Sequence, residues 1–356
     1  MYSNNNFLRS YAGTDFITGL RAIAATMVVI IHTGALVGAG SVGEAFTSVG
    51  KYGVDIFFVI SGFTIAKTFS EAPNYRFYLV RRLLRIAPLY YFLITLSLLL
   101  VATGVLAPSY WMNEFGASAD IYNWLMHISF LSYLDYRVAN SVLSVEWSIP
   151  IEIFWYVCLP FILFATLRLR NVLLGAFAFV LLTAVLAYVL KQTLGTSMPA
   201  KWSPIAYGHL FILGAYSNHF RKQKSAGNEK RQDYAVVFSV LAFVACFVAS
   251  FSGRGELLAI ATFILLAVFD ARRMQLLNKL LANKLMLFIG SISYSIYLIH
   301  PLVISALESI QSFVELEKGV VFFLVVYTLT VMLSSITYLY IEKPTNRLGR
   351  TLANKV

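Results

Sequence analysis

Two ionisable residues lie in the first apolar run of the chain, where charge is costly. Arg21 and His32 are eleven residues apart. On a regular helix this spacing places them within about 20° of one face and about 16 Å apart along the axis. Ionisable groups inside a membrane span mark functional sites more often than elsewhere. One interpretation is a polar face with a proton-transferring histidine. The structural alternative is an arginine reaching the inner interface and a histidine bonded to a carbonyl.

A carboxylate enters a later apolar run, at 147–167. Glu146 belongs at the membrane interface, and Glu152 lies nearly two helical turns deeper. A carboxylate at that depth requires a partner, because an unpaired charge is costly to bury. Arg21, His32 or a bound ligand would serve, and a purely structural ion pair is the alternative.

A stripe of polar residues occurs near the end of the chain. Ser293, Tyr297 and His300 follow an i, i+4, i+7 spacing, so a helix would direct all three toward the bundle interior. Pro301 also frees a backbone carbonyl within that helix. A polar packing seam is the alternative reading of this stripe.

A basic cluster follows the second apolar run. Arg81 and Arg85 are one helical turn apart, and Arg82 is adjacent. Guanidinium groups pair bidentately with phosphate oxygens, so the cluster could clamp a phosphorylated ligand. It could equally anchor a positively charged loop at the inner membrane surface. Within the second run, Asp55 marks the outer end, and Ser61 begins a notch of small residues.

The sequence lacks other catalytic and cofactor signatures. His127, His209 and His219 have no metal-ligand spacing. No P-loop, G-x-S-x-G elbow or dinucleotide fingerprint occurs. Cys158 and Cys246 both lie in apolar runs, which suggests neither a disulfide framework nor a metal cluster. We therefore expect no metal.

Apolar helices must position these residues. Of the 356 residues, 59% are apolar and 13% are charged, against about 45–50% and about 25% in soluble domains. A soluble enzyme or a disordered chain is therefore excluded. Since a span needs about 20 mostly apolar residues, we predict an all-α membrane protein with about ten transmembrane helices. The runs are 16–37, 54–70, 83–103, 147–167, 171–190, 205–220, 234–251, 257–269, 285–310 and 320–341. The weaker stretch 121–134 is too short to span, and we predict a re-entrant or interfacial segment.

Membrane topology accounts for the net charge of +11. With a cytoplasmic N-terminus, the predicted inner segments hold 21 Lys and Arg residues and the outer segments hold 6. Because cytoplasmic loops retain Lys and Arg, we expect both termini in the cytoplasm and no nucleic-acid partner. The predicted organisation is a polar tail at 1–14, a membrane domain at 15–346 and a cytoplasmic tail at 347–356.

Taken together, these motifs resemble those of the acyltransferase-three family of integral-membrane O-acyltransferases. Six blocks match in chain order: Arg21 with His32, Gly53 to Phe63, Arg81 to Pro88, Trp147 to Tyr156, Ser293 to His300, and Glu342 to Arg347. The family often has two adjacent glutamates in the fourth block, whereas here Ile153 follows Glu152. Some members carry a further esterase-like domain. The sequence ends nine residues after Arg347, so we expect the stand-alone membrane part.

The resemblance implies transfer of an acyl group, usually acetyl, from cytoplasmic acetyl-CoA to a hydroxyl of a surface glycan or its lipid-linked precursor. His32 would act as general base or carry the acyl group covalently, and Arg21 and Glu152 complete the expected catalytic group. Eight further side chains are expected to contact substrate or coenzyme A: Arg81, Arg82, Arg85, Asp55, Ser61, Trp147, Tyr297 and His300. Membrane lipids are the other expected partners, and a bacterial inner membrane is the expected location.

A carrier or flippase for a lipid-linked sugar is the alternative function, since it would also need many helices and a polar interior. Such carriers often contain two similar halves, and residues 1–170 do not align with residues 171–356. This asymmetry favours the enzyme. None of these residues identifies the acceptor or the position acylated.

Overall fold

The computed structural model describes residues 14–36, 38–71, 74–165, 169–224, 241–246, 249, 256–270, 273–309 and 318–354. Every regular element in these ranges is a helix, which confirms the predicted all-α class. In chain order the elements are α1 (Asp15–His32), α2 (Gly40–Gly50), α3 (Gly53–Glu71), α4 (Tyr75–Ala102), α5 (Tyr110–Glu114), α6 (Ile121–Ile128), η2 (Ser132–Leu134), α7 (Ser148–Ala165), α8 (Leu169–Leu194), α9 (Met198–Lys201), α10 (Pro204–Lys224), α12 (Leu257–Val268), α13 (Gln275–Leu281), α14 (Lys284–Ser291), α15 (Ser293–Ser309), α16 (Val320–Thr337), η3 (Tyr338–Glu342) and α17 (Lys343–Asn354).

Length and apolar composition qualify five helices of the described ranges as membrane spans. They are α1, α3, α4, α8 and the continuous unit from α16 into α17. A sixth candidate is the pair of α14 and α15, which bends by 67° at a short break. The prediction of ten spans and of cytoplasmic termini is therefore not confirmed.

The other predicted spans do not meet this criterion of length and apolar composition, and the reason differs from one to the next. The helix α12 and the apolar part of α7 are shorter than 18 residues. The helix α10 is long enough but carries Asn218, His219, Arg221 and Lys222 in its second half. The predicted run at 234–251 lies mostly outside the described residues.

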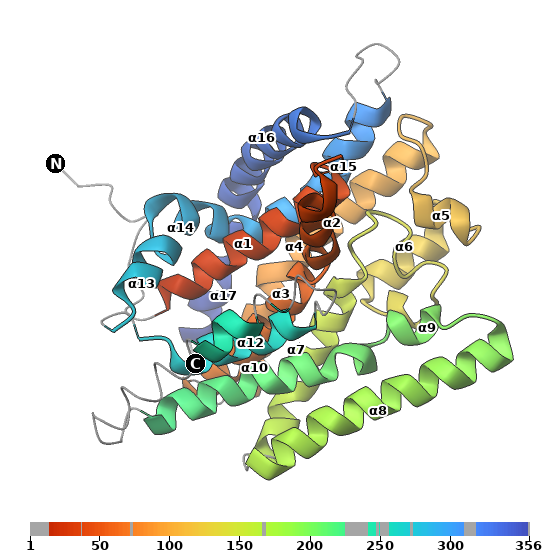
Figure 1. Cartoon of the computed structure of the whole chain (residues 1–356). Coiled ribbons are helices and arrows are strands. Elements are labelled where there is room, and N and C mark those ends of the chain that lie inside the picture. The colour runs from red at the N-terminus through yellow and green to blue at the C-terminus, as the bar shows by residue number, and fades with distance from the viewer. Residues whose placement is uncertain are drawn as a thin grey trace.

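The helices α3 and α10 cross at backbone contact near the centre of the bundle. A Cβ atom on Gly62 would overlap the carbonyl oxygen of Phe211, and one on Gly214 would overlap that of Val59. Small residues permit this close approach between helices in a membrane. The helix α8 packs along the other side of α10, at the edge of the bundle (Figure 1). Many of its large apolar side chains are exposed.

An irregular segment connects α6 to α7 through the interior. Glu146 was expected at the interface, but it is fully buried. Its carboxylate accepts hydrogen bonds from the backbone N–H groups of Val142 (2.6 Å), Leu143 (2.9 Å) and Val145 (3.1 Å). Buried backbone groups require such partners wherever the chain is not helical. The carboxylate therefore stabilises the turn that leads into α7.

The stretch 121–134 forms the eight-residue helix α6 and the short turn η2. Neither element is long enough to cross a membrane. His127 at the end of α6 is fully buried and is hydrogen-bonded to the hydroxyl of Tyr90 on α4 (2.8 Å). This histidine therefore has a structural role in holding α6 against α4.

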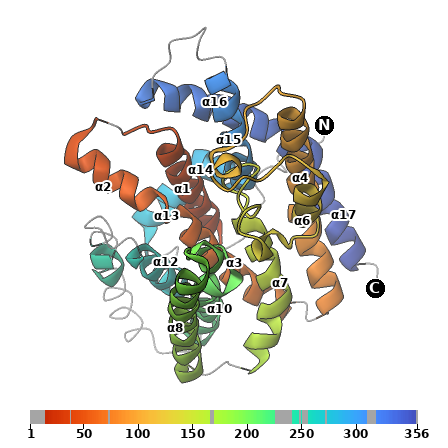
Figure 2. The same ribbon diagram turned by 90° about the vertical axis from the view of Figure 1, so that its right-hand side faces the viewer.

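A π-helical turn, η3, joins α16 to α17. Glu342 lies in this turn, is buried, and accepts a hydrogen bond from Ser295 on α15. Beyond the turn, α17 runs along the first part of α4 (Figure 2). The end of α17 therefore lies beside the beginning of α4, at the end of the bundle where α1 begins and α3 ends.

Candidate active site

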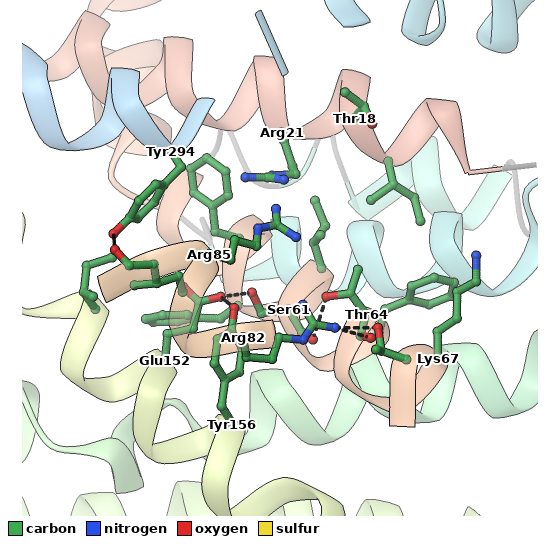
Figure 3. A pocket seen from close by; sticks show the side chains of 18 of the residues that line it. Thr18, Arg21, Ser61, Thr64, Lys67, Arg82, Arg85, Glu152, Tyr156 and Tyr294 are labelled. Atoms are coloured by element: carbon green, nitrogen blue, oxygen red, sulfur yellow. Dashed lines mark hydrogen bonds between the residues drawn. The ribbon is translucent and has the colours of Figure 1, made fainter. Parts of the chain in front are cut away.

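A cavity of about 560 Å³ opens at that end of the bundle. Its lining includes six basic side chains and one carboxylate: Arg21, Lys67, Arg81, Arg82, Arg85, Arg350 and Glu152. These groups come from five helices, and Figure 3 shows most of them converging on one space. Such an excess of positive charge in low-dielectric walls attracts and concentrates anions. The cavity therefore suits a polyanionic ligand.

Arg21 and Arg85 approach each other from α1 and α4 in the middle of the cavity (Figure 3). Their like charges repel, and the carboxylates of Glu152 and Glu342 offset this repulsion. Arg21 thus lines the cavity instead of facing outward. The pairing leaves two guanidinium groups side by side, an arrangement that an anion would stabilise.

Glu152 is held by two hydroxyl groups. It accepts hydrogen bonds from Ser61 on α3 and from Tyr156 one turn along its own helix, at 2.7 Å for the tyrosine. Of the partners considered from the sequence, Arg21 interacts with Glu152 electrostatically. Among the described residues, no hydrogen bond connects Glu152 to His32, and Glu152 lines the basic cavity instead.

Arg82 forms part of the cavity wall. It is 5% exposed, and its guanidinium donates to the carbonyl of Thr64 (2.6 Å) and to Oγ1 of Thr68 (2.7 Å). It also lies over the rings of Tyr78 and Tyr156. These contacts fasten α4 to α3, so part of the Arg82 guanidinium is engaged within the protein.

His32 and His300 form a hydrogen-bonded pair beyond the inner end of the cavity. Nδ1 of His32 lies 2.7 Å from Nε2 of His300, and the two rings are stacked. Nδ1 of His300 lies 3.0 Å from the carbonyl oxygen of Ile296. His300 is fully buried, whereas His32 is partly accessible.

These contacts determine the tautomers of the pair. A carbonyl oxygen only accepts, so Nδ1 of His300 carries the proton and Nε2 of the neutral ring is an acceptor. Nδ1 of His32 must then donate to it. The remaining nitrogen of His32, Nε2, keeps its lone pair and can accept a proton.

Tyr297 separates the cavity from the histidine pair. Its ring lines the cavity, and its centroid lies 6.3 Å from that of His300. Its hydroxyl donates to the carbonyl of Val145 (2.7 Å) and pairs with Ser148 (2.9 Å). Because its proton is committed to Val145, Tyr297 holds the start of α7 against α15 in this state.

The stripe of Ser293, Tyr297 and His300 faces the interior, as its spacing predicts, and each of the three is at most 5% exposed. Asp55 and Trp147 are not brought to the cavity. Asp55 interacts with Lys51 and Glu256, and Trp147 packs on the rings of Phe58 and Tyr207.

Among the charged and amide side chains of the cavity lining, sequence reasoning missed Lys67, Asn346 and Arg350. Each lies near the end of an apolar run, where basic and polar residues are expected as ordinary membrane-surface groups. Glu342 was noted only as part of a matched block. Its position beside the arginines depends on the π-helical turn, for which the sequence contains no recognisable signal.

The His, Cys, Asp and Glu side chains of the described residues are dispersed. No three His, Cys, Asp or Glu side chains gather as a ligand set among the described residues. The polar groups of the site include guanidinium groups, a carboxylate held by hydroxyls, and a histidine pair.

Comparisons with known proteins identify the type of domain. Residues 14–339 match a family model described as an acyltransferase domain. O-acetyltransferase OatA of Staphylococcus aureus strain NCTC 8325 is 25% identical over 94% of this chain and 57% of the relative. YrhL of Bacillus subtilis strain 168, named as a candidate peptidoglycan O-acetyltransferase, is 26% identical over 100% of this chain and 58% of the relative. The chain thus spans less than two thirds of the length of these relatives. No solved structure matches it.

Proposed function

The chain belongs to the acyltransferase family whose model it matches over residues 14–339, and from this premise we propose that it transfers an acetyl group from acetyl-CoA to a glycan hydroxyl. The acceptor is a cell-surface glycan or its lipid-linked precursor. OatA is named as an O-acetyltransferase and YrhL as a candidate one, which supports acetyl as the acyl group. The name of YrhL includes peptidoglycan, which supports a glycan as the acceptor.

The observation that carries the proposal is the position of the basic cavity relative to the histidine pair. Coenzyme A has its phosphates at one end and its thioester at the other. The cavity offers guanidinium groups along its length and ends at Tyr297, next to His300. A donor with phosphates on Arg81, Arg85 and Arg21 would therefore direct its thioester toward His32.

In the proposed reaction, His32 acts as the general base. The acceptor hydroxyl gives its proton to Nε2 of His32 while its oxygen attacks the carbonyl carbon of the thioester. The carbon–sulfur bond breaks, and the departing thiolate takes the proton from the imidazolium. The products are the acetyl ester and free coenzyme A. His300 stabilises the transient imidazolium, because it accepts from Nδ1 and is itself anchored on Ile296.

The proposed orientation places the cavity at the cytoplasmic face of a bacterial inner membrane. The concentration of Lys and Arg at this end of the bundle supports it, since cytoplasmic segments retain these residues. The donor would then enter from the cytoplasm. The partly accessible edge of His32, about 16 Å further along α1 than Arg21, would meet the acceptor.

The test is thiol release by the purified protein in lipid nanodiscs. Acetyl-CoA is supplied with and without a lipid-linked glycan extract, and wild type is compared with His32→Ala. His209→Ala is the matched control, because His209 lies on α10 and does not line the cavity.

The expected result is release that requires the glycan extract and falls about 10²–10⁴-fold in His32→Ala. The control should retain wild-type release. Equal release by wild type and His32→Ala would end the general-base proposal. Absence of release from every variant, with transport of a lipid-linked sugar, would establish a carrier instead.

A further inference from the structure

The mouth of the cavity is built by two helix ends that are far apart in the sequence. Lys67 lies near the end of α3, and Asn346 and Arg350 lie one turn apart on α17. All three line the cavity. In Figure 3, Lys67 lies at the end of the cavity away from Glu152 and Tyr294. Lys67 and Arg350 lie outside the six matched blocks, and Asn346 lies within the sixth block, Glu342 to Arg347, with no role expected from the sequence.

Close packing places the α17 residues at this entrance. A Cβ atom on Gly349 would lie 3.4 Å from the Cα of Arg81, so α17 and α4 pack nearly backbone to backbone here. Arg350 follows directly and is exposed at the helix end. Arg81 is one turn nearer the start of α4 than Arg85. Arg350 therefore lies at the level of Arg81, outside the level of the Arg21–Arg85 pair.

The two cations at the mouth form no ion pair with a carboxylate whose side chain the structure describes. Among those side chains, no carboxylate lies within 4.0 Å of Lys67 Nζ or of the Arg350 guanidinium. The one carboxylate of the cavity lining, Glu152, is held deeper by Ser61 and Tyr156. A second anionic group of the ligand would complete this outer site, since charge-assisted contacts to phosphate are strong.

We propose that Lys67 and Arg350, with Asn346, form a subsite for the 3′-phosphate of the acyl donor, so that the enzyme selects coenzyme A over its dephosphorylated form. This inference rests on the proposed function. In an extended donor the thioester is followed by the pantetheine arm, the diphosphate and finally the ribose 3′-phosphate. When the thioester points toward the histidine pair, the diphosphate lies at the level of Arg21 and Arg85, and the 3′-phosphate lies at the mouth of the cavity.

The experiment compares two nucleotides on the full chain in zwitterionic nanodiscs. Dissociation constants for coenzyme A and 3′-dephospho-coenzyme A are measured by calorimetry for wild type, Lys67→Gln and Arg350→Gln. Arg76→Gln is the matched control, because Arg76 is an exposed cation at the same end of α4 that does not line the cavity. Arg350→Lys retains the charge if the glutamine variant does not fold.

Wild type is expected to bind coenzyme A roughly 10- to 100-fold more tightly than the dephosphorylated form, because only coenzyme A offers the charged 3′-phosphate to these hydrogen-bond donors. Each glutamine variant should reduce this ratio while its affinity for the dephosphorylated form stays unchanged. Arg76→Gln and Arg350→Lys should retain most of the wild-type ratio between the two dissociation constants.

Other outcomes overturn the proposal in distinguishable ways. Equal binding of both nucleotides by wild type removes the subsite while leaving the proposed donor intact. If the glutamine variants weaken the binding of both nucleotides equally, the two cations attract anions in general and do not contact the 3′-phosphate. Loss of the wild-type preference in nanodiscs of anionic lipid identifies a lipid headgroup as the ligand. Failure of either nucleotide to bind, with no thiol release, refutes the proposed function itself.

Discussion

Replacement of His300 by leucine tests the histidine pair most directly. Leucine is a good helix former but removes the acceptor that lies 2.7 Å from Nδ1 of His32. In the proposed step, that hydrogen bond stabilises His32 after it takes the proton. Hydrogen bonds to charged groups contribute about 1.5–3 kcal/mol, so kcat should fall roughly 10- to 150-fold.

The same substitution in a His32→Ala background separates this role from a structural one. Residues that act as a unit have strongly non-additive effects. His32→Ala with His300→Leu should therefore be as slow as His32→Ala alone. His300→Gln should recover part of the activity, because its amide oxygen can accept from Nδ1 of His32.

The assay is steady-state thiol release with acetyl-CoA and the glycan extract, from which kcat and the donor KM are obtained separately. The donor KM should stay within about threefold of wild type, since His300 does not line the cavity. Size-exclusion profiles and thermal unfolding establish that each variant is folded. The reasoning is refuted if His300→Leu slows the wild type and the His32→Ala variant by the same factor. It is also refuted if His300→Leu raises the donor KM while kcat is unchanged.

Three further predictions concern packing and charge. Gly62→Ala should lower stability by about 1–3 kcal/mol or more, because its Cβ would overlap the Phe211 carbonyl. Gly175→Ala meets only an ordinary contact at 3.8 Å, so equal thermal unfolding of these two variants would contradict the close helix crossing. Glu146→Ala leaves three buried N–H groups without their acceptor, each costing about 1–3 kcal/mol; an unchanged unfolding temperature would show that the carboxylate does not support this turn. Arg21→Ala should raise the KM for acetyl-CoA roughly tenfold or more, and Arg21→Lys less, whereas an unaltered KM in both would place the donor elsewhere.

The sequence alone indicated the membrane class and drew attention to several polar residues that the structure brings to the cavity or to the histidine pair. Arg21, His32, Glu152 and His300 are conspicuous because each interrupts a long apolar run. Charge or hydrogen-bonding capacity in such a run is costly without a partner. Helical periodicity also predicted correctly that Tyr297 and His300 face the interior. These properties are local, so the order of residues is enough to reveal them.

The sequence could not establish how many runs cross the membrane. Ten runs are apolar enough to suggest spans, yet α12 and the apolar part of α7 are short, and α14 with α15 forms a bent pair. A run of apolar residues has the same composition whether it crosses a membrane straight, bends or lies buried among other helices. Neighbouring helices decide between these arrangements.

Only the tertiary structure decided which polar residues meet. His32 pairs with His300, 268 residues away, while Glu152 joins Ser61 and Tyr156 in the basic cavity. Arg350 reaches that cavity because α17 packs closely along α4. Periodicity states which face of a helix a side chain occupies, but the helix opposite that face is determined by packing between elements remote in the chain.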